Sequence, residues 1–314
     1  MRKSLLVAAA ILFTQSAHAW DATGHEAVAA IAWDNMKPAT RTRAAAILEA
    51  SMKGDCLHEL GSAANPRAFF IRAATWADVV RPFNNDDTRE CIQFHQGTWH
   101  FFDRFWSGVS GGTGSDAPHE RTDIPVNSTN AIERLEHFRP LVACQTPPCD
   151  VTPFIRSHEL AWILHLVGDI HQPLHTGSRV TTEPDELKGD QGGNLFKFKQ
   201  DTIPRNLHSL WDRSISNTIP RQNGEAEIAY IDRVIAKIQH DHPKASLEAR
   251  LESGEFATWS KEGFATAESV AYPSTLQRGG IPSAAYNATV FNATDEAVAL
   301  AGYRLADLLD RMFE

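Results

Sequence analysis

The sequence has few cysteines, no long apolar run beyond its first residues and no excess of positive charge. Its four cysteines lack the C-x2-C spacing that is typical of zinc sites built from thiolates. No segment after residue 19 approaches the roughly 20 apolar residues that a membrane-spanning helix needs. Acidic residues outnumber basic ones by 39 to 30, which gives a net charge of −9. An acidic protein repels nucleic acid and anionic lipid unless bound cations supply a local positive field.

Patterns typical of β-strands are also scarce, and helical periodicity dominates instead. Apolar residues recur near i, i+3, i+4 and i+7 in many segments, as expected for helices with one buried face. These segments are 22–36, 38–52, 66–80, 129–141, 154–171, 206–216, 225–240, 255–270 and 293–313. Leu195–Lys199 is the one candidate for a small β-hairpin. We therefore predict a single, mainly α-helical bundle domain over residues 20–314, with surface loops at Ser107–Asp116 and Val180–Gly193.

Residues 1–19 have the three-part pattern of a secretory signal peptide. Met1–Lys3 is basic, Leu5–Phe13 is apolar, and Ala17-His18-Ala19 provides an A-x-A cleavage site. Cleavage at this site leaves a chain that begins at Trp20, and the loss of two basic residues takes its net charge from −9 to −11. We expect the protein to be exported, either secreted or periplasmic.

The four cysteines fit an oxidising compartment, in which disulfides persist. Cys144 and Cys149 flank a short Pro-rich loop that can close on itself, and this pairing leaves Cys56 with Cys91. Four cysteines allow three connectivities, and the sequence favours this one among them.

The most informative pattern is His165-x3-Asp169-x5-His175. On a helix, His165 and Asp169 lie one turn apart on the same face, so an imidazole and a carboxylate can bind one ion. Pro173 then ends the regular helix and allows the chain to direct His175 toward a second ion. The preceding residues 160–164 are apolar, so this polar cluster is expected at the end of a buried helix.

Several other pairs have spacings suited to metal binding. His208 and Asp212 again lie at i, i+4. The N-terminal half adds Thr75-Trp-Ala-Asp78-Val-Val-Arg81 and Trp99-His100-Phe-Phe-Asp103, and the segment Trp20-Asp-Ala-Thr-Gly-His25 lies directly after the cleavage site. Cleavage would free an α-amino group beside a carbonyl oxygen, and the two can chelate a metal as a five-membered ring. Imidazole and carboxylate without thiolate suit catalytic zinc with open positions.

With these motifs in this order and spacing from Trp20 to the final helix, the chain resembles the zinc-dependent, single-strand-preferring nucleases of the S-one/P-one type, relatives of bacterial zinc phospholipase C. The resemblance implies three zinc ions. The first ion would be held by Asp78, His100, His165 and Asp169. The second would be held by His175, His208 and Asp212. The third would be held by the amino nitrogen and carbonyl oxygen of Trp20, by His25 and by a bridging Asp169. Three Zn²⁺ ions would offset the acidity of the protein toward a polyanion.

The same resemblance implies hydrolysis of single-stranded DNA and RNA to 5′-phosphate products by an activated water that attacks phosphorus in line. Arg81 would bind non-bridging phosphate oxygens in the transition state. Phe101 would stack on a nucleobase, which requires an unpaired base, and Asp103 would accept a hydrogen bond from a base edge or a water. Asn194 is a further candidate for the cleft. Core packing of Phe101 and a surface salt bridge of Arg81 are the alternatives.

Some features lie outside these motifs or depart from them. His171 is expected either to support a metal ligand or to be structural, and His158 has no motif. His240 and His242 are expected at a helix end in solvent. His95, His119 and His137 have no partner at a ligand spacing. Asp21 follows Trp20 where the family more often has a small residue, and its charge is expected to perturb the third ion.

Two rival functions share the ligand set. A zinc phospholipase C acting on choline lipids normally supplies Glu as the last ligand, whereas this chain has Asp212. A zinc-bound binding protein without catalysis has no need for open metal positions or for Arg81. We expect a monomer that acts on single-stranded nucleic acid and nucleotides, with 3′-nucleotidase activity as an open question.

Overall fold

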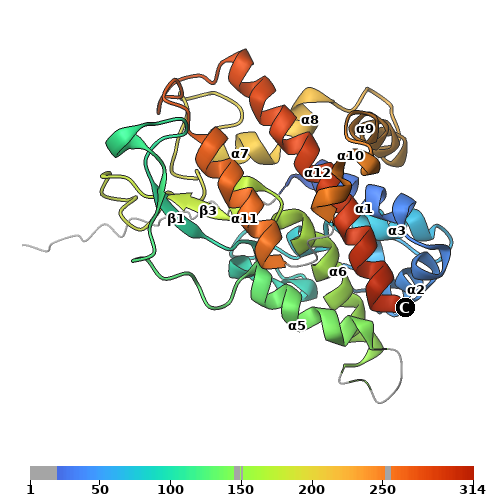
Figure 1. The fold of residues 1–314 in the computed structure, drawn as a ribbon. Coiled ribbons are helices and arrows are strands. Elements are labelled where there is room, and N and C mark those ends of the chain that lie inside the picture. Colours follow the sequence, from blue (N-terminus) through green and yellow to red (C-terminus); the bar gives the residue numbers. More distant parts are fainter. Residues whose placement is uncertain (1–19, 145–148, 150, 252–255) are drawn as a thin grey trace, which may run out of the picture.

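Helices packed around a buried apolar core form most of the protein (Figure 1). The computed structural model describes residues 20–144, 149, 151–251 and 256–314, so the expected signal peptide lies outside the described residues. The α-helices are α1 (Ala22–Asn35), α2 (Pro38–Glu49), α3 (Pro66–Ala73), α4 (Trp76–Val79), α5 (Ala131–Ala143), α6 (Pro153–Asp169), α7 (Leu207–Asp212), α8 (Ser214–Thr218), α9 (Glu227–Asp241), α10 (Lys244–Leu251), α11 (Phe256–Thr266) and α12 (Ala284–Phe313). Shorter helical turns are η1 (His58–Leu60), η2 (Glu90–Phe94), η3 (Gly97–His100), η4 (Gly114–Asp116), η5 (Pro173–His175) and the π-helical turn η6 (Ala267–Ala271).

The helices near the candidate site begin at polar side chains that cap them. Asp21, Asn206 and Ser283 each accept a hydrogen bond from the backbone N–H three residues later, at the starts of α1, α7 and α12. Such caps satisfy a backbone donor that has no partner inside the helix and contribute about 1 kcal/mol each. Asp21 therefore caps α1, a role that was not expected from its place after Trp20 in the sequence.

The core lies between the long helix α12, which crosses the molecule diagonally in Figure 1, and helices α1, α6 and α9. The apolar face predicted for the last helix is confirmed, since all of its members are buried: Val298, Ala301, Leu305, Leu308, Leu309 and Met312. α6 is buried along nearly its whole length, which explains its continuous apolar sequence before His165. Burial of these side chains is the main source of stability.

A small three-stranded sheet lies at one end of the helical body (Figure 1). β1 (Arg104–Ser107) pairs with β2 (His119–Glu120) in antiparallel fashion and with β3 (Gly177–Arg179) in parallel. The β1–β3 pairing brings the segment after His100 beside the segment after His175, because Phe102 N–H donates to the carbonyl of His175 at 2.8 Å. At the predicted hairpin, the described chain forms one antiparallel bridge between Lys197 and Asn206.

The mainly α-helical fold class is confirmed, and most predicted helices occur with small shifts of their ends. The prediction of a surface loop at Val180–Gly193 is wrong for its second half, because Glu186 and Asp190 are fully buried. Asp190 accepts a hydrogen bond of 2.5 Å from the Tyr272 hydroxyl, and Glu186 pairs with Arg278. Among the described residues, no helix is both long and apolar enough to cross a membrane.

The disulfides join the pairs that the sequence favoured. Cys56 is bonded to Cys91 across 35 residues, and Cys144 to Cys149 across five. The first bridge ties η2 to the segment before η1, close to the loop that follows α4. No cysteine of the described chain is free.

Candidate metal centre

The imidazoles and carboxylates singled out in the sequence gather around the C-terminal end of α6. They form two neighbouring groups, which we name after their central carboxylates. The Asp169 group consists of His25, Asp78, His100, His165 and Asp169, and the Asp212 group consists of His175, His208 and Asp212. In three sets of these residues, the donor atoms all lie within 4.8 Å of one another. The sets are His25, Asp78 and His165; His100, His165 and Asp169; and the whole Asp212 group.

In the Asp169 group, the two carboxylate oxygens of Asp169 face different imidazoles. Oδ2 lies 3.1 Å from Nδ1 of His100 and 3.3 Å from Nε2 of His165, whereas Oδ1 lies 3.4 Å from Nε2 of His25. The His25 ring approaches closely because Gly168 has no side chain; a Cβ there would lie 2.9 Å from Nδ1 of His25. Asp169 is thus oriented as a carboxylate that could bridge two cations.

Burial sets the protonation of this group. It lowers the pKa of His25 and His100 well below the usual value and that of His165 to about 3, so the rings are neutral near pH 7. Neutral imidazole is the form that binds a metal. Burial, together with the charges of nearby carboxylates, raises the pKa of Asp169 well above its usual range. Bound cations would favour the ionised carboxylate instead.

In the Asp212 group, main-chain carbonyls fix both imidazoles. Nδ1 of His175 lies 2.7 Å from the carbonyl oxygen of His100, and Nδ1 of His208 lies 2.7 Å from that of Gly192. A carbonyl only accepts, so each Nδ1 carries the proton and each neutral ring has its lone pair on Nε2. These two Nε2 atoms face each other at 3.1 Å. A cation between them would turn this opposition of lone pairs into two attractions, so the donor set fits a metal ion.

Two further contacts orient the ligands of the Asp212 group. The side-chain amide of Gln172 donates to Oδ1 of Asp212 at 2.6 Å. Gly192, whose carbonyl binds His208, has a φ of +58°, and a Cβ at this residue would lie 2.2 Å from the carbonyl oxygen of Leu174. Only glycine fits there without strain. Contacts of this kind orient metal ligands in known metal sites.

Trp20 brings the start of the described chain to the junction of the two groups. Its side chain is buried, and its indole N–H donates to the carbonyl of Gly168 at 2.9 Å. The backbone N–H of Asp21 donates to the carbonyl of Asp212 at 3.1 Å. The backbone of residues 20 and 21 is therefore held between the end of α6 and the end of α7.

A cleft of about 480 Å³ opens beside the centre. It is lined by Asp21, Ala22, Thr75, Asp78, Val79, Ser209, Asp212 and Arg213. Carboxylates outnumber the single arginine on this wall, so the cleft would repel a polyanion unless cations were bound. The guanidinium of Arg81 lies 3.6 Å from Oδ1 of Asp78, one of these carboxylates.

The other predicted substrate residues lie in two segments, one directly after His100 and one at Asn194. Phe101 and Asp103 follow His100 and are partly exposed, and burial with the charge of Asp190 raises the pKa of Asp103 to about 7. Asn194 is buried, and its side-chain amide donates to the carbonyl of Gln191 in its own turn at 2.9 Å. None of these three belongs to the described lining of the cleft.

Most of the remaining histidines have partners away from the centre. Nε2 of His158 lies 2.6 Å from a carboxylate oxygen of Asp55. His171 contacts Arg304, which fits the structural one of its two expected roles. His240 and His242 lie at the end of α9 as expected, and His240 is exposed, but His242 is only partly exposed and lies 3.1 Å from Asp295.

Sequence reasoning missed two side chains near the centre. Gln172 lies inside the His165–His175 motif, so its place between two ligands was a usable signal. His95 lies close enough to Asp78 and Arg81 for their charges to influence its pKa, which burial lowers. Nothing in the sequence indicated that His95 lies near Asp78 and Arg81, because its spacing from them is not that of a ligand pair.

A helical fold that brings neutral imidazoles and buried carboxylates together in this way provides side-chain groups that could hold divalent cations. The family model described as S1/P1 Nuclease matches residues 20–314, which is nearly the whole chain. The chain therefore belongs to the S1/P1 nuclease family.

Comparison with individual proteins agrees with this assignment. Nuclease S1 of Aspergillus oryzae is 25% identical over 66% of this chain and 58% of its own length. Endonuclease 1 of Arabidopsis thaliana is 30% identical over 26% of this chain and 24% of its own length, and Endonuclease 4 of the same plant is 39% identical over 19% and 17%. The chain thus spans less than two thirds of the length of each of these relatives.

Proposed function

We propose that this protein is an exported, zinc-dependent phosphodiesterase that cleaves single-stranded DNA and RNA and leaves 5′-phosphates. The observation that carries the proposal is the orientation of Asp169, whose two oxygens face different imidazoles: Oδ2 faces His100 and His165, and Oδ1 faces His25. Membership of the S1/P1 nuclease family supports the same activity. Two disulfides support export.

In this proposal, the imidazoles, the carboxylates and the main chain of Trp20 bind three zinc ions. One ion is bound by Asp78, His100, His165 and Asp169, a second by His175, His208 and Asp212, and a third by His25, Asp169 and the main-chain nitrogen and oxygen of Trp20. The third requires that the chain begin at Trp20, since only a free α-amino group is a good ligand. The contacts of the Trp20 indole with Gly168 and of the Asp21 backbone N–H with Asp212 support a place for this backbone beside the ligands.

Zinc would supply Lewis-acid stabilisation of the phosphate and a more acidic water. The protein's own contribution is to orient the reactants and to exclude competing charges. Arg81 would donate to the non-bridging phosphate oxygens while it remains near Asp78, which keeps its guanidinium at the edge of the cleft. Gln172 would hold the carboxylate of Asp212 in its binding orientation.

Recognition of the base is assigned to Phe101 and Asp103. A stacked nucleobase on Phe101 would account for a preference for single strands, because a paired base has no free face. With its pKa near 7, Asp103 could accept or donate a hydrogen bond at a base edge. Asn194 has a weaker claim, since its amide already donates within its own turn. Activity on 3′-mononucleotides is part of the proposal, as is a monomeric state.

A substrate panel with the mature protein tests the proposal. Single-stranded DNA, RNA, duplex DNA, a 3′-mononucleotide and phosphatidylcholine are incubated with zinc, with chelator, and with zinc restored after chelation. We expect cleavage of single strands that disappears with chelator and returns with zinc. Hydrolysis of the lipid alone would favour the phospholipase, and zinc binding without hydrolysis would favour a binding protein.

A further inference from the structure

The loop after α4 presents an aromatic ring that the proposed catalytic centre does not use. Phe83 is 79% exposed, which is unusual for a large apolar side chain. It follows Arg81 by two residues, so its Cα lies at most about 7.6 Å from that of Arg81. The backbone of Phe83 is therefore near the edge of the cleft, to which Val79 contributes.

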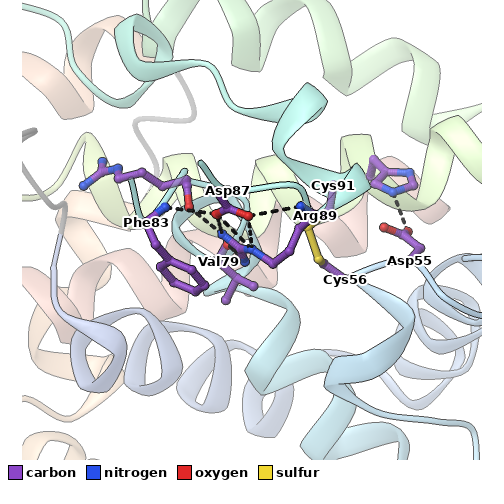
Figure 2. Close-up of a disulfide and its surroundings, with 9 residues drawn as sticks. Asp55, Cys56, Val79, Phe83, Asp87, Arg89 and Cys91 are labelled. Carbon is purple, nitrogen blue, oxygen red and sulfur yellow. Dashed lines mark hydrogen bonds and ion pairs between the residues drawn. A yellow bond between two sulfur atoms is a disulfide. The ribbon is translucent and has the colours of Figure 1, made fainter. Parts of the chain in front are cut away.

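One face of this ring is covered by a guanidinium. The guanidinium carbon of Arg89 lies 3.8 Å from the centre of the Phe83 ring, a cation–π contact. Figure 2 shows Arg89 between Phe83 and the Cys56–Cys91 disulfide. With one face supported and the side chain mostly in solvent, a second flat group can stack on the other face.

Hydrogen bonds hold Arg89 in place and connect it to the cleft. Its guanidinium donates to the carbonyl of Val79 at 2.8 Å and to that of Arg81 at 2.7 Å, and it forms a forked pair with Asp87 (Figure 2). The backbone N–H of Phe83 donates to Asp87 at 3.0 Å. The pKa of Asp87 is lowered by these bonds, so its charge is matched by that of Arg89. Ring, guanidinium and Arg81 backbone thus form one ordered unit.

We propose that Phe83 is a second stacking position for an unpaired nucleobase, beside the scissile phosphate and outside the proposed metal centre. This inference rests on the proposed function. A rigid, exposed aromatic face joined to a phosphate-binding arginine suits a single strand, whose adjacent base can stack irrespective of its sequence. Phe83 is then a substrate-binding residue that lengthens the recognised strand by one nucleotide.

Binding and cleavage measured together test the inference. Binding uses a fluorescent phosphorothioate single strand on the zinc-loaded protein, and cleavage uses the ordinary strand and a 3′-mononucleotide. Phe83→Ala should weaken binding of the strand about fivefold or more, the lower end of base–aromatic stacking, and raise KM with little change in kcat. Phe83→Trp should retain binding, and Phe83→Leu should behave like Phe83→Ala. The mononucleotide should be cleaved equally by all variants.

The matched control is Ile155→Ala, an exposed apolar residue on the same helix as Asp169 but about 21 Å away along its axis. It should leave binding unchanged. Equal binding by Phe83→Ala and the unsubstituted protein overturns the inference and leaves the proposed function intact, and full binding by Phe83→Leu overturns stacking. Weakened binding without any cleavage supports the position but contradicts the nuclease proposal. An unsubstituted protein that neither binds nor cleaves single strands overturns both.

Discussion

In the Asp212 group both imidazoles donate to main-chain carbonyls and the carboxylate accepts from Gln172, whereas several ligand atoms of the Asp169 group have no hydrogen-bond partner among the described residues. Neither ring nitrogen of His25 has a hydrogen-bond partner within the described chain, and the same holds for Nε2 of His100 and Oδ1 of Asp169. His165 is fixed by the carbonyl of Ala74 at 2.7 Å, and Nδ1 of His100 lies 3.1 Å from Oδ2 of Asp169. The fold alone orders the Asp212 group, while the Asp169 group is expected to need its cations for a defined geometry.

This difference matters because buried polar atoms without partners destabilise a protein by about 1–3 kcal/mol each. The Asp169 group concentrates several of them in a small volume at the junction of α1 and α6. A bound cation would satisfy them together, so folding and metal binding should be coupled most strongly there. Substitutions in the two groups should therefore differ in their effects, and the largest effect is expected at Asp169.

Replacement of Asp169 should have the largest consequence. Asp169→Asn removes the negative charge that two ions would share, so we expect the loss of more than one zinc ion per chain and a fall in kcat/KM on the order of a thousandfold. Asp212→Asn should lose only one ion. Zinc content per chain and hydrolysis of single-stranded DNA are measured for both variants. Equal zinc contents in the two variants would contradict the bridging role of Asp169.

Extension of the N-terminus should act on the Asp169 group alone. A variant that keeps Ala19 before Trp20 has an amide in place of the free amine, and amides are poor metal ligands. We expect zinc content to fall by one per chain and activity by about a hundredfold, since one Lewis acid contributes several kcal/mol. The control is the chain that begins at Trp20. Unchanged zinc content in the extended chain would refute the role of the Trp20 amino group as a zinc ligand.

Loss of a hydrogen bond to a ligand should weaken the Asp212 group without destroying it. Gln172→Ala removes the donor at 2.6 Å from Asp212 and should lower zinc affinity about 10- to 100-fold, as seen for orienting contacts generally. Gln172→Glu should be worse, because a second carboxylate beside Asp212 repels it. Chelator titration measures the affinity. If Gln172→Glu bound zinc as tightly as the unsubstituted protein, the orienting role would be wrong.

Much of the helical fold followed from the sequence, because apolar residues recur at helical spacing in helices such as α9 and α12, which bury one face. The start of α12 was missed by nine residues, since residues 284–292 contain Asn and Thr with low helical propensity, yet Tyr286, Val290 and Phe291 are buried there. The strands were missed because they have only two to four residues and no apolar alternation. Their pairing depends on contacts between segments distant in sequence.

The same limit applies to the candidate site. Spacing on one helix suggested pairs such as His165 and Asp169, which indeed face each other. It could not reveal that the carbonyl of Gly192 fixes His208, or that Tyr272 holds Asp190 beneath the same loop. Such contacts join residues 16 and 82 positions apart, and composition alone made that loop look like surface.

The smallest effect is expected at the side chain of Trp20, and it sharpens the contrast with the extended chain. Trp20→Phe in the chain that begins at residue 20 keeps the amine and the carbonyl but loses the indole hydrogen bond to Gly168. We expect unchanged zinc content, activity within a few-fold, and a loss of about 1–2 kcal/mol in the free energy of unfolding. Denaturant unfolding and zinc analysis measure the two quantities. The proposed ligands of residue 20 are main-chain atoms. A loss of zinc in Trp20→Phe would therefore mean that the third zinc site depends on the Trp20 side chain and not on the freed terminus.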